Sequence, residues 1–427
     1  MAGRVMPKNL SRRKFIGASA GAVVGLAALG WVYRAKKKTP LPEQLVADPL
    51  GVLDLPEGFS YRILQRTGDL MSDGFLAPSA PDGMACFAHG DSEWVLMRNH
   101  EIDEGVPADQ TLGFSSTHAG GVTRLVLDRS NAAVKSTNFI LTGTSRNCSG
   151  GASPYGWLSC EETEEDGHGY VFLCDPTASS LEAPHRLSSF GRFSHEAAAF
   201  DPATGMTYLT EDKNTGAIYR HVPYAQHSPF AEGDLQALKV KGLPEFDLSS
   251  GKALGDYFDV EWVSINDPSA TTMPTRKQAK ELGAARFSRG EGAFFAGGSA
   301  YFCSTNGGPA ERGQIYRLDM SVSGQDDRLT LIAQADKEDA LDRPDNITVA
   351  PWGGVFVAED GKSPNGIFLI RPDGKAIPVA RNAVNGGDSE VTGICFSPDG
   401  KWLFLNIQWE GLTLAVTGPF ENLSTAI

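Results

Sequence analysis

The stretch Glu196-Ala197-Ala198-Ala199-Phe200 is followed by a turn at 201–205 and by a second strand-like run that ends in Glu211-Asp212. Similar units begin at Glu291 and Asp345, and further second strands end near residues 99, 160, 305 and 406. The intervals between strand ends are 47 to 61 residues, except for one of 94 that contains an insert at about 224–286. Short strands repeated at this period are typical of a β-propeller. We therefore predict an all-β, six-bladed β-propeller whose insert contains a short helix at 275–284; a β-sandwich or an irregular all-β domain is the alternative.

The charge of the chain is unevenly distributed. The 427 residues carry a net charge of −14, but residues 1–40 hold nine basic residues and no acid, which leaves residues 41–427 with a net charge of −23. Such an acidic body excludes non-specific nucleic-acid binding, which needs a basic surface. The acids either form a solvated surface or bind cations.

The amino terminus has the pattern of an export signal. Ser11-Arg12-Arg13-Lys14-Phe15-Ile16 is a twin-arginine signature, and a weakly apolar run follows at 15–33. We expect residues 1–40 to be read by the twin-arginine translocation machinery, which places the protein in the periplasm or outside the cell. Cleavage of this segment and its retention as a membrane anchor both remain open. Residues 41–427 then form a single propeller domain.

The predicted blades bring acidic side chains to one end of the propeller. The start of a first strand and the end of the antiparallel second strand lie at the same end, near the axis. The residues at these positions are Glu196, Glu291 and Asp345 at strand starts, and Asn99, His100, Glu101, Cys160, Glu161, Glu162, Glu211, Asp212, Asn306, Glu359 and Asp360 at strand ends. So many carboxylates cannot share a low-dielectric site without cations or protons, so we predict a metal cluster.

The residue types narrow the choice of metal and ligand. Carboxylate and amide oxygens suit Ca²⁺, whereas a thiolate from Cys160 points to iron or zinc; the alternative is that Cys160 packs beneath the mouth. Arg289 and Arg343 stand two residues before Glu291 and Asp345, where a guanidinium either captures an oxyanion such as phosphate or balances nearby acids. An anion held over several cations is the arrangement of metal-assisted phosphoryl transfer. Residues 41–427 contain no P-loop, Gly-x-Ser-x-Gly or His-Glu-x-x-His motif.

Several motifs together resemble the PhoX-type alkaline phosphatases. They are Asn99-His100-Glu101, Gly120–Thr123, Asn147–Gly151, Trp157–Glu162, Gly191–Glu196, Tyr208–Asp212 and Asp342–Asn346, together with the twin-arginine start. The resemblance implies a six-bladed propeller that holds two Fe³⁺ and several Ca²⁺ ions. It implies that Cys160 is a catalytic iron ligand and that Arg289 holds the phosphate. The implied metal ligands are Glu196, Glu291, Asp345, Asn99, Glu101, Glu161, Glu211, Asp212, Glu359 and Asp360.

We therefore interpret the chain as a calcium- and iron-dependent phosphomonoesterase that is exported in the folded state and acts on phosphate esters. Another metal-dependent propeller hydrolase, such as a phosphodiesterase or a lactonase, is the alternative enzyme. A non-catalytic periplasmic propeller stapled by calcium is the alternative outside the enzymes.

Overall fold

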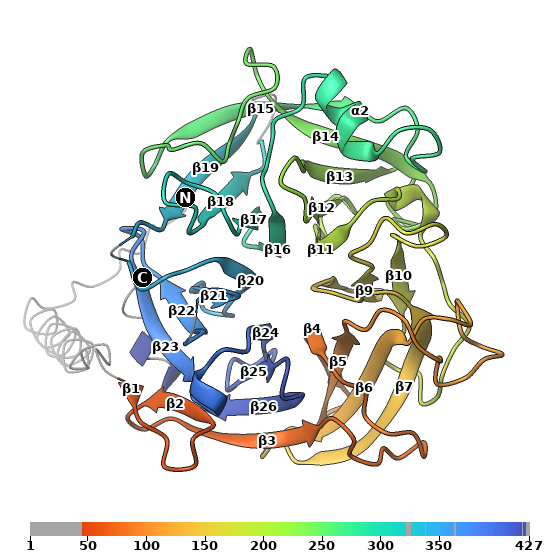
Figure 1. Cartoon of the computed structure of the whole chain (residues 1–427), viewed down its shortest axis with the longest axis vertical. Coiled ribbons are helices and arrows are strands. Elements are labelled where there is room, and N and C mark those ends of the chain that lie inside the picture. Colours follow the sequence, from red (N-terminus) through yellow and green to blue (C-terminus); the bar gives the residue numbers. More distant parts are fainter. Residues whose placement is uncertain (1–44, 322–325, 338, 363, 421, 424–427) are drawn as a thin grey trace, which may run out of the picture. The chain divides into compact units, whose positions relative to one another are not determined.

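The computed structural model describes residues 45–427 except 322–325, 338, 363, 421 and 424–427. The predicted twin-arginine segment lies outside the described residues. Within those residues, no helix is both long enough and apolar enough to cross a membrane. The described part is built almost entirely from antiparallel strands arranged around a common centre (Figure 1), so the predicted all-β propeller is confirmed.

The strands of the described residues form five sheets. Two four-stranded sheets contain β4 (Pro81–His89), β5 (Glu93–His100), β6 (Gly120–Asp128) and β7 (Val134–Thr144), and β24 (Val391–Phe396), β25 (Trp402–Ile407), β26 (Leu412–Thr417) and β3 (Ser60–Arg66). A three-stranded sheet contains β8 (Gly151–Ser153), β9 (Gly156–Cys160) and β10 (Val171–Cys174). A six-stranded sheet runs in the order β1 (Leu45–Val46), β2 (Leu53–Pro56), β23 (Ala376–Asn382), β22 (Gly366–Ile370), β21 (Val355–Glu359) and β20 (Pro344–Val349).

The fifth sheet has nine strands and includes part of the segment expected to be an insert. Its order is β11 (His195–Phe200), β12 (Thr207–Glu211), β13 (Ile218–Pro223), β14 (Gly233–Val240), β15 (Tyr257–Ser264), β19 (Asp327–Gln334), β18 (Gln314–Asp319), β17 (Ser299–Ser304) and β16 (Gly290–Ala296). Strand β15 pairs with both β14 and β19, and so joins two four-stranded units. The expected helix is α2 (Thr275–Glu281), which is shorter than 275–284 because Gly283, with φ +81°, follows its end. The described part of the chain also contains two 3₁₀ turns, η1 (Ser188–Phe190) and η2 (Val384–Gly386).

The sheets stack face to face around the centre because this arrangement buries their apolar side chains. The hydrophobic core lies between neighbouring sheets: Trp94 and Leu125 of one sheet pack with Phe404 and Ala415 of the next. The ring is closed by pairing of β3, near the amino terminus, with β26, near the carboxyl terminus. This pairing covers the edges that both strands would otherwise expose. The innermost strands β4, β11, β16, β20 and β24 point toward the centre and position the site (Figure 1).

Candidate metal centre

A repeated β-bulge redirects one acidic side chain in each of four inner strands. In β4, Pro81 pairs with His100 and Met84 pairs with Arg98, so Asp82 and Gly83 lie opposite the single residue Asn99. The same register shift occurs in β11, β16 and β20. A bulge bends the strand and redirects its side chains. The first bulge residues are Asp82, Glu196, Glu291 and Asp345.

The three-stranded sheet has a cysteine at this position. Asn147 bridges to Glu161 and Gly151 pairs with Leu158, so Cys148 is the first residue of the extra segment between the two pairings. Cys148 therefore takes the place of the bulge carboxylates.

A second repeated feature fixes the residue that follows each second strand. The backbone N–H of this residue donates a hydrogen bond to a backbone carbonyl of the same blade. The carbonyl belongs to the residue immediately before the first paired residue of the inner strand. The bonds are Glu101 to Ala80 (2.9 Å), Glu162 to Arg146 (2.9 Å), Asp212 to Ser194 (3.3 Å), Thr305 to Arg289 (3.0 Å), Asp360 to Arg343 (3.1 Å) and Gln408 to Glu390 (3.3 Å). Four of the six donors carry carboxylates, which adds a second set of acids beside the bulge residues.

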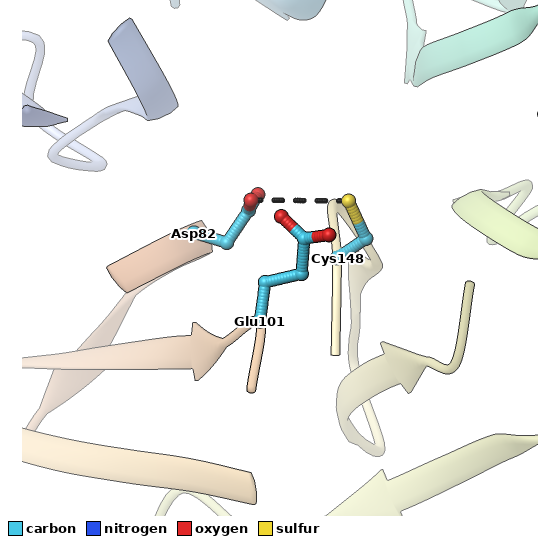
Figure 2. A group of neighbouring side chains, drawn as sticks. All are labelled: Asp82, Glu101 and Cys148. Atoms are coloured by element: carbon cyan, nitrogen blue, oxygen red, sulfur yellow. Dashed lines mark hydrogen bonds between the residues drawn. The ribbon is translucent and has the colours of Figure 1, made fainter. Parts of the chain in front are cut away.

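These two sets meet in one cluster. Four groups of side chains have ligand atoms within 4.8 Å of one another, and they are linked through Cys148, Glu196 and Asp345. We call their members the mouth cluster: Asp82, Glu101, Cys148, Glu162, Glu196, Glu291, Asp345, Asp360 and Glu390. Figure 2 shows Asp82, Glu101 and Cys148 pointing toward one another, with Cys148 Sγ 3.8 Å from Asp82 Oδ2.

Burial and mutual repulsion raise the pKa values of these acids. The pKa of Asp82 rises to about 8 because of burial and the charge of Glu101, and that of Glu162 rises to about 7, mainly because of burial. Burial and neighbouring carboxylates hold the pKa values of Glu196 and Glu291 well above their usual range. Burial, Asp82 and Glu196 likewise raise the pKa of the Cys148 thiol. The cluster must therefore bind protons or cations.

Five of the predicted ligands lie in the mouth cluster. They are Glu101, Glu196, Glu291, Asp345 and Asp360. Asp212 lies beside the cluster and pairs with Arg289, with Nε–Oδ1 and Nη2–Oδ2 distances of 2.8 and 3.1 Å.

Four other predicted ligands already have protein partners. Glu161 accepts hydrogen bonds from the backbone N–H groups of Ser145, Gly169 and Tyr170 and lies 2.7 Å from His168 Nδ1. Glu211 accepts a hydrogen bond from Tyr219 Oη (2.8 Å) and pairs with Arg276 (3.3 Å). Glu359 accepts hydrogen bonds from the backbone N–H groups of Asp342 (2.6 Å) and Gly366 (3.2 Å). Asn99 Oδ1 accepts from Trp157 Nε1 and Ser159 Oγ at 2.8 Å each. These side chains fix the wall of the site.

The structure leaves the Cys160 thiol outside the mouth cluster, although its backbone carbonyl accepts a hydrogen bond from the N–H of Cys148 (3.0 Å). Its side chain is fully buried and packs in a hydrophobic core with Leu158, Val171 and Phe190. In the described part of the chain, none of the groups with metal-ligand spacing contains Cys160. This environment agrees with the alternative interpretation, in which the cysteine packs beneath the mouth.

Sequence reasoning missed three members of the mouth cluster, Asp82, Cys148 and Glu390, and it placed Glu162 at the mouth without assigning it as a metal ligand. One signal could have revealed Cys148, because Asn147-Cys148 aligns with His195-Glu196 and Pro344-Asp345 as the pair that begins an inner strand. Strand alternation could have separated Glu162 from Glu161 as the ligand, since adjacent residues of a strand point in opposite directions.

A separate group of potential ligands lies on two loops. Asp103, His118 and Glu165 have ligand atoms within 4.8 Å of one another and share no residue with the mouth cluster. His118 Nε2 is 3.0 Å from Glu165 Oε2, and His118 Nδ1 is 2.9 Å from Ser115 Oγ. The histidine therefore has protein partners on both nitrogens.

Arg289 lies at the edge of the mouth cluster. Besides Asp212, its guanidinium contacts Glu291, with Nη2 2.7 Å from Oε1, and its side chain is 29% exposed. Burial acts to lower the pKa of Arg289, but the hydrogen bond to Asp212 and the charge of Glu291 raise it above its ordinary value. A fixed positive charge thus stands beside the acids with one side open to solvent.

The sequence model of the family described as "Alkaline phosphatase PhoX" matches residues 41–138 and 127–411. No curated protein matches the chain. Solved structures with a similar fold include a gluconolactonase from Xanthomonas campestris (12% identity, 89% of this chain and 99% of that chain, TM-score 0.47) and the calcium-binding protein regucalcin from Agrobacterium tumefaciens (13%, 84% and 95%, 0.43). A periplasmic gluconolactonase from Pseudomonas aeruginosa is similar at 15% identity over 82% of this chain and 90% of that chain, with a TM-score of 0.43. At these identities the structural likenesses carry no argument about function.

Proposed function

Because the chain belongs to the PhoX family of alkaline phosphatases, we propose that it is a metal-dependent phosphomonoesterase and that the mouth cluster is its active site. The observation that carries this proposal is the convergence of eight carboxylates and one thiol, buried or half-buried, with ligand atoms at metal-binding spacing. Perturbed acids concentrated in this way are typical of functional sites.

We also infer that the propeller has six blades. The backbone bond that follows each second strand recurs six times around the ring, from Glu101 to Gln408. The sheets number five because β15 joins the units β11–β14 and β16–β19. We also propose that residues 41–427 form a single domain.

The mouth cluster fits resident cations. Glu196 Oε2 is buried and has no hydrogen-bond partner among the described residues, as expected of an oxygen reserved for a metal. Carboxylates such as those of Glu291 and Asp345 suit Ca²⁺, and a thiolate from Cys148 beside them suits iron. The expected Ca²⁺ and Fe³⁺ ions would neutralise the ester oxygens and act as Lewis acids. We assign the thiolate to Cys148 in place of Cys160.

The chain's own residues bind and orient the ester. The guanidinium of Arg289 presents a planar fork that matches phosphate oxygens and cannot coordinate a cation. Its bonds to Asp212 and Glu291 hold it in position. A preorganised charge of this kind stabilises the negative charge that develops during phosphoryl transfer.

Two cysteine variants test the metal assignment. Cys148→Ala should lose iron and activity, because its thiolate belongs to the cluster. Cys160→Ala should keep its metals and lose only stability, because this side chain fills a hydrophobic core. Elemental analysis, together with kcat/KM on an aryl phosphate, compares both with the parent. Loss of iron from Cys160→Ala alone would reverse the assignment.

Arg289→Ala tests the phosphate role. Removal of one preorganised charge stabiliser should lower kcat/KM by about 10²- to 10³-fold while the metal content stays at the parent level. A variant as active as the parent would show that Arg289 does not bind the phosphate. If the parent contains calcium without a transition metal and hydrolyses no phosphate ester, the non-catalytic calcium-stapled propeller becomes the better account.

We propose that the protein is exported by the twin-arginine pathway to the periplasm or beyond. The pair Arg12-Arg13 followed by an apolar run supports this destination. Retention of residues 1–40 would attach the enzyme to the membrane, and fractionation of cells into soluble and membrane pools distinguishes the two outcomes.

A further inference from the structure

Three arginines occupy equivalent positions around the mouth cluster. Arg146, Arg289 and Arg343 stand two residues before Cys148, Glu291 and Asp345, respectively. The backbone carbonyl of each arginine accepts a hydrogen bond from the residue that follows the second strand of its blade. The donors are the N–H groups of Glu162, Thr305 and Asp360, at 2.9, 3.0 and 3.1 Å. We call these three residues the arginine rim.

The backbone at these positions is left-handed. The φ angles are +48°, +45° and +57° for Arg146, Arg289 and Arg343. This conformation is unfavourable for an L-residue. Ala80, at the equivalent position before Asp82, has φ +46°, so the backbone does not itself require arginine. The three arginines therefore need an explanation from their side chains.

The side chains of the arginine rim lie beside the acids of the mouth cluster. Arg146 contacts Glu162 and lies 2.7 Å from Glu101, with 39% of its side chain exposed. Arg289 and Arg343 are both within electrostatic reach of Asp360. Arg343 is exposed, and in the described residues it forms no side-chain hydrogen bond or close ion pair. Its guanidinium fork is thus available to a ligand.

A single phosphate does not need three guanidinium groups in addition to cations. One bidentate arginine occupies two of its oxygens, and the metals would take others. We propose that Arg289 holds the phosphate that is transferred and that the other two members of the arginine rim, Arg146 and Arg343, bind a second phosphate group of the substrate, so that the enzyme prefers esters that carry two phosphates. This inference rests on the proposed phosphatase function and names the substrate class of the same site.

The test compares two esters built on the same three-carbon diol. Propane-1,3-diol bisphosphate has two equivalent phosphates, and the monophosphate of the same diol has one, so statistics alone give a preference of about two. With the metal-loaded full-length enzyme we expect kcat/KM to favour the bisphosphate by at least about tenfold more, the value of one charge-assisted hydrogen bond. Arg343→Gln should remove most of this preference. Arg371→Gln is the matched control, because Arg371 is an exposed arginine that pairs with Asp373 outside the rim.

The possible outcomes distinguish failure of the second phosphate site from failure of the proposed phosphatase activity. A parent that hydrolyses both esters with only the statistical preference would overturn the second phosphate site and leave the phosphatase intact. The second phosphate site is overturned in the same way if Arg343→Gln keeps the parent's preference. A parent that hydrolyses neither ester would refute the phosphatase. Melting temperature would then test whether the arginine rim binds a second phosphate. In the parent, the bisphosphate should raise the melting temperature more than the monophosphate does, and in Arg343→Gln the two esters should raise it equally.

Discussion

Asp82→Asn should stabilise the metal-free protein at pH 8 and weaken its response to calcium. Asp82 is 4% exposed, and burial together with the charge of Glu101 raises its pKa from 3.8 to about 8. The folded metal-free protein therefore binds this proton more tightly than the unfolded chain does. The contribution of Asp82 to the free energy of unfolding should be largest below about pH 4 and should be lost as the pH rises from about 4 to about 8.

The size of the effect follows from the change in acidity. Each tenfold change in the acid dissociation constant corresponds to about 1.4 kcal/mol. At pH 8 without cations, ionised Asp82 therefore lowers the free energy of unfolding by on the order of 5 kcal/mol. Asparagine removes this cost and keeps the shape of the side chain. Its Oδ1 can still accept the hydrogen bond that Gln408 Nε2 donates at 2.7 Å.

Calcium should reverse the order of stability. A bound cation takes the place of the proton, so the parent gains more from calcium than Asp82→Asn does. Urea denaturation at pH 5 and pH 8, with a chelator or with excess calcium, measures all four states. Asp373→Asn, an exposed turn residue, is the control and should behave like the parent. Equal stability of the metal-free parent at both pH values, or equal calcium stabilisation of parent and Asp82→Asn, would refute the reasoning.

Three further predictions concern packing, a buried histidine and export. Gly83→Ala should destabilise the fold by on the order of 3 kcal/mol and lower metal content, because its Cβ would lie 1.6 Å from the carbonyl oxygen of Ser149; denaturation and elemental analysis measure both effects. Burial lowers the pKa of His221 from 6.5 to about 4, so parent stability should fall as the pH drops through this range, and His221→Leu should flatten the loss by up to about 3 kcal/mol in urea titrations. Replacement of both Arg12 and Arg13 by Lys should leave the protein in the cytoplasm, as fractionation would show; normal export would contradict the signal assignment.

The sequence was sufficient for the propeller but not for its sheet boundaries. Alternating apolar strands and glycine turns are local patterns, and their repetition along the chain predicts stacked antiparallel units. The union of two units through β15 could not be predicted, because the pairing of β15 with β19 joins residues 257–260 to residues 327–330. Pairing between outer strands so distant in the chain depends on the closed ring and leaves no local signature.

The site was predictable as a location and only partly as a set of residues. The convergence of strand ends correctly suggested that Glu196, Glu291 and Asp345 meet, since each begins an inner strand. Acidic pairs at the ends of second strands were ambiguous, because adjacent residues of a strand point in opposite directions. The structure resolves one pair: Glu162 lies in the mouth cluster, whereas Glu161 binds backbone N–H groups and His168.

Cys148 and Cys160 show why position in the repeat matters more than neighbours in sequence. Cys160 directly precedes two glutamates, but it is the last residue of β9 and its side chain packs in the hydrophobic core. Cys148 has no acidic neighbour in sequence, yet it occupies the position at which other blades place Asp82 or Glu196. The residue two before that position is arginine in three blades, so the same backbone turn can present a cation ligand on one side and an anion-binding group on the other. A propeller that repeats this turn can therefore bring metals and phosphate together at one mouth without a separate binding domain.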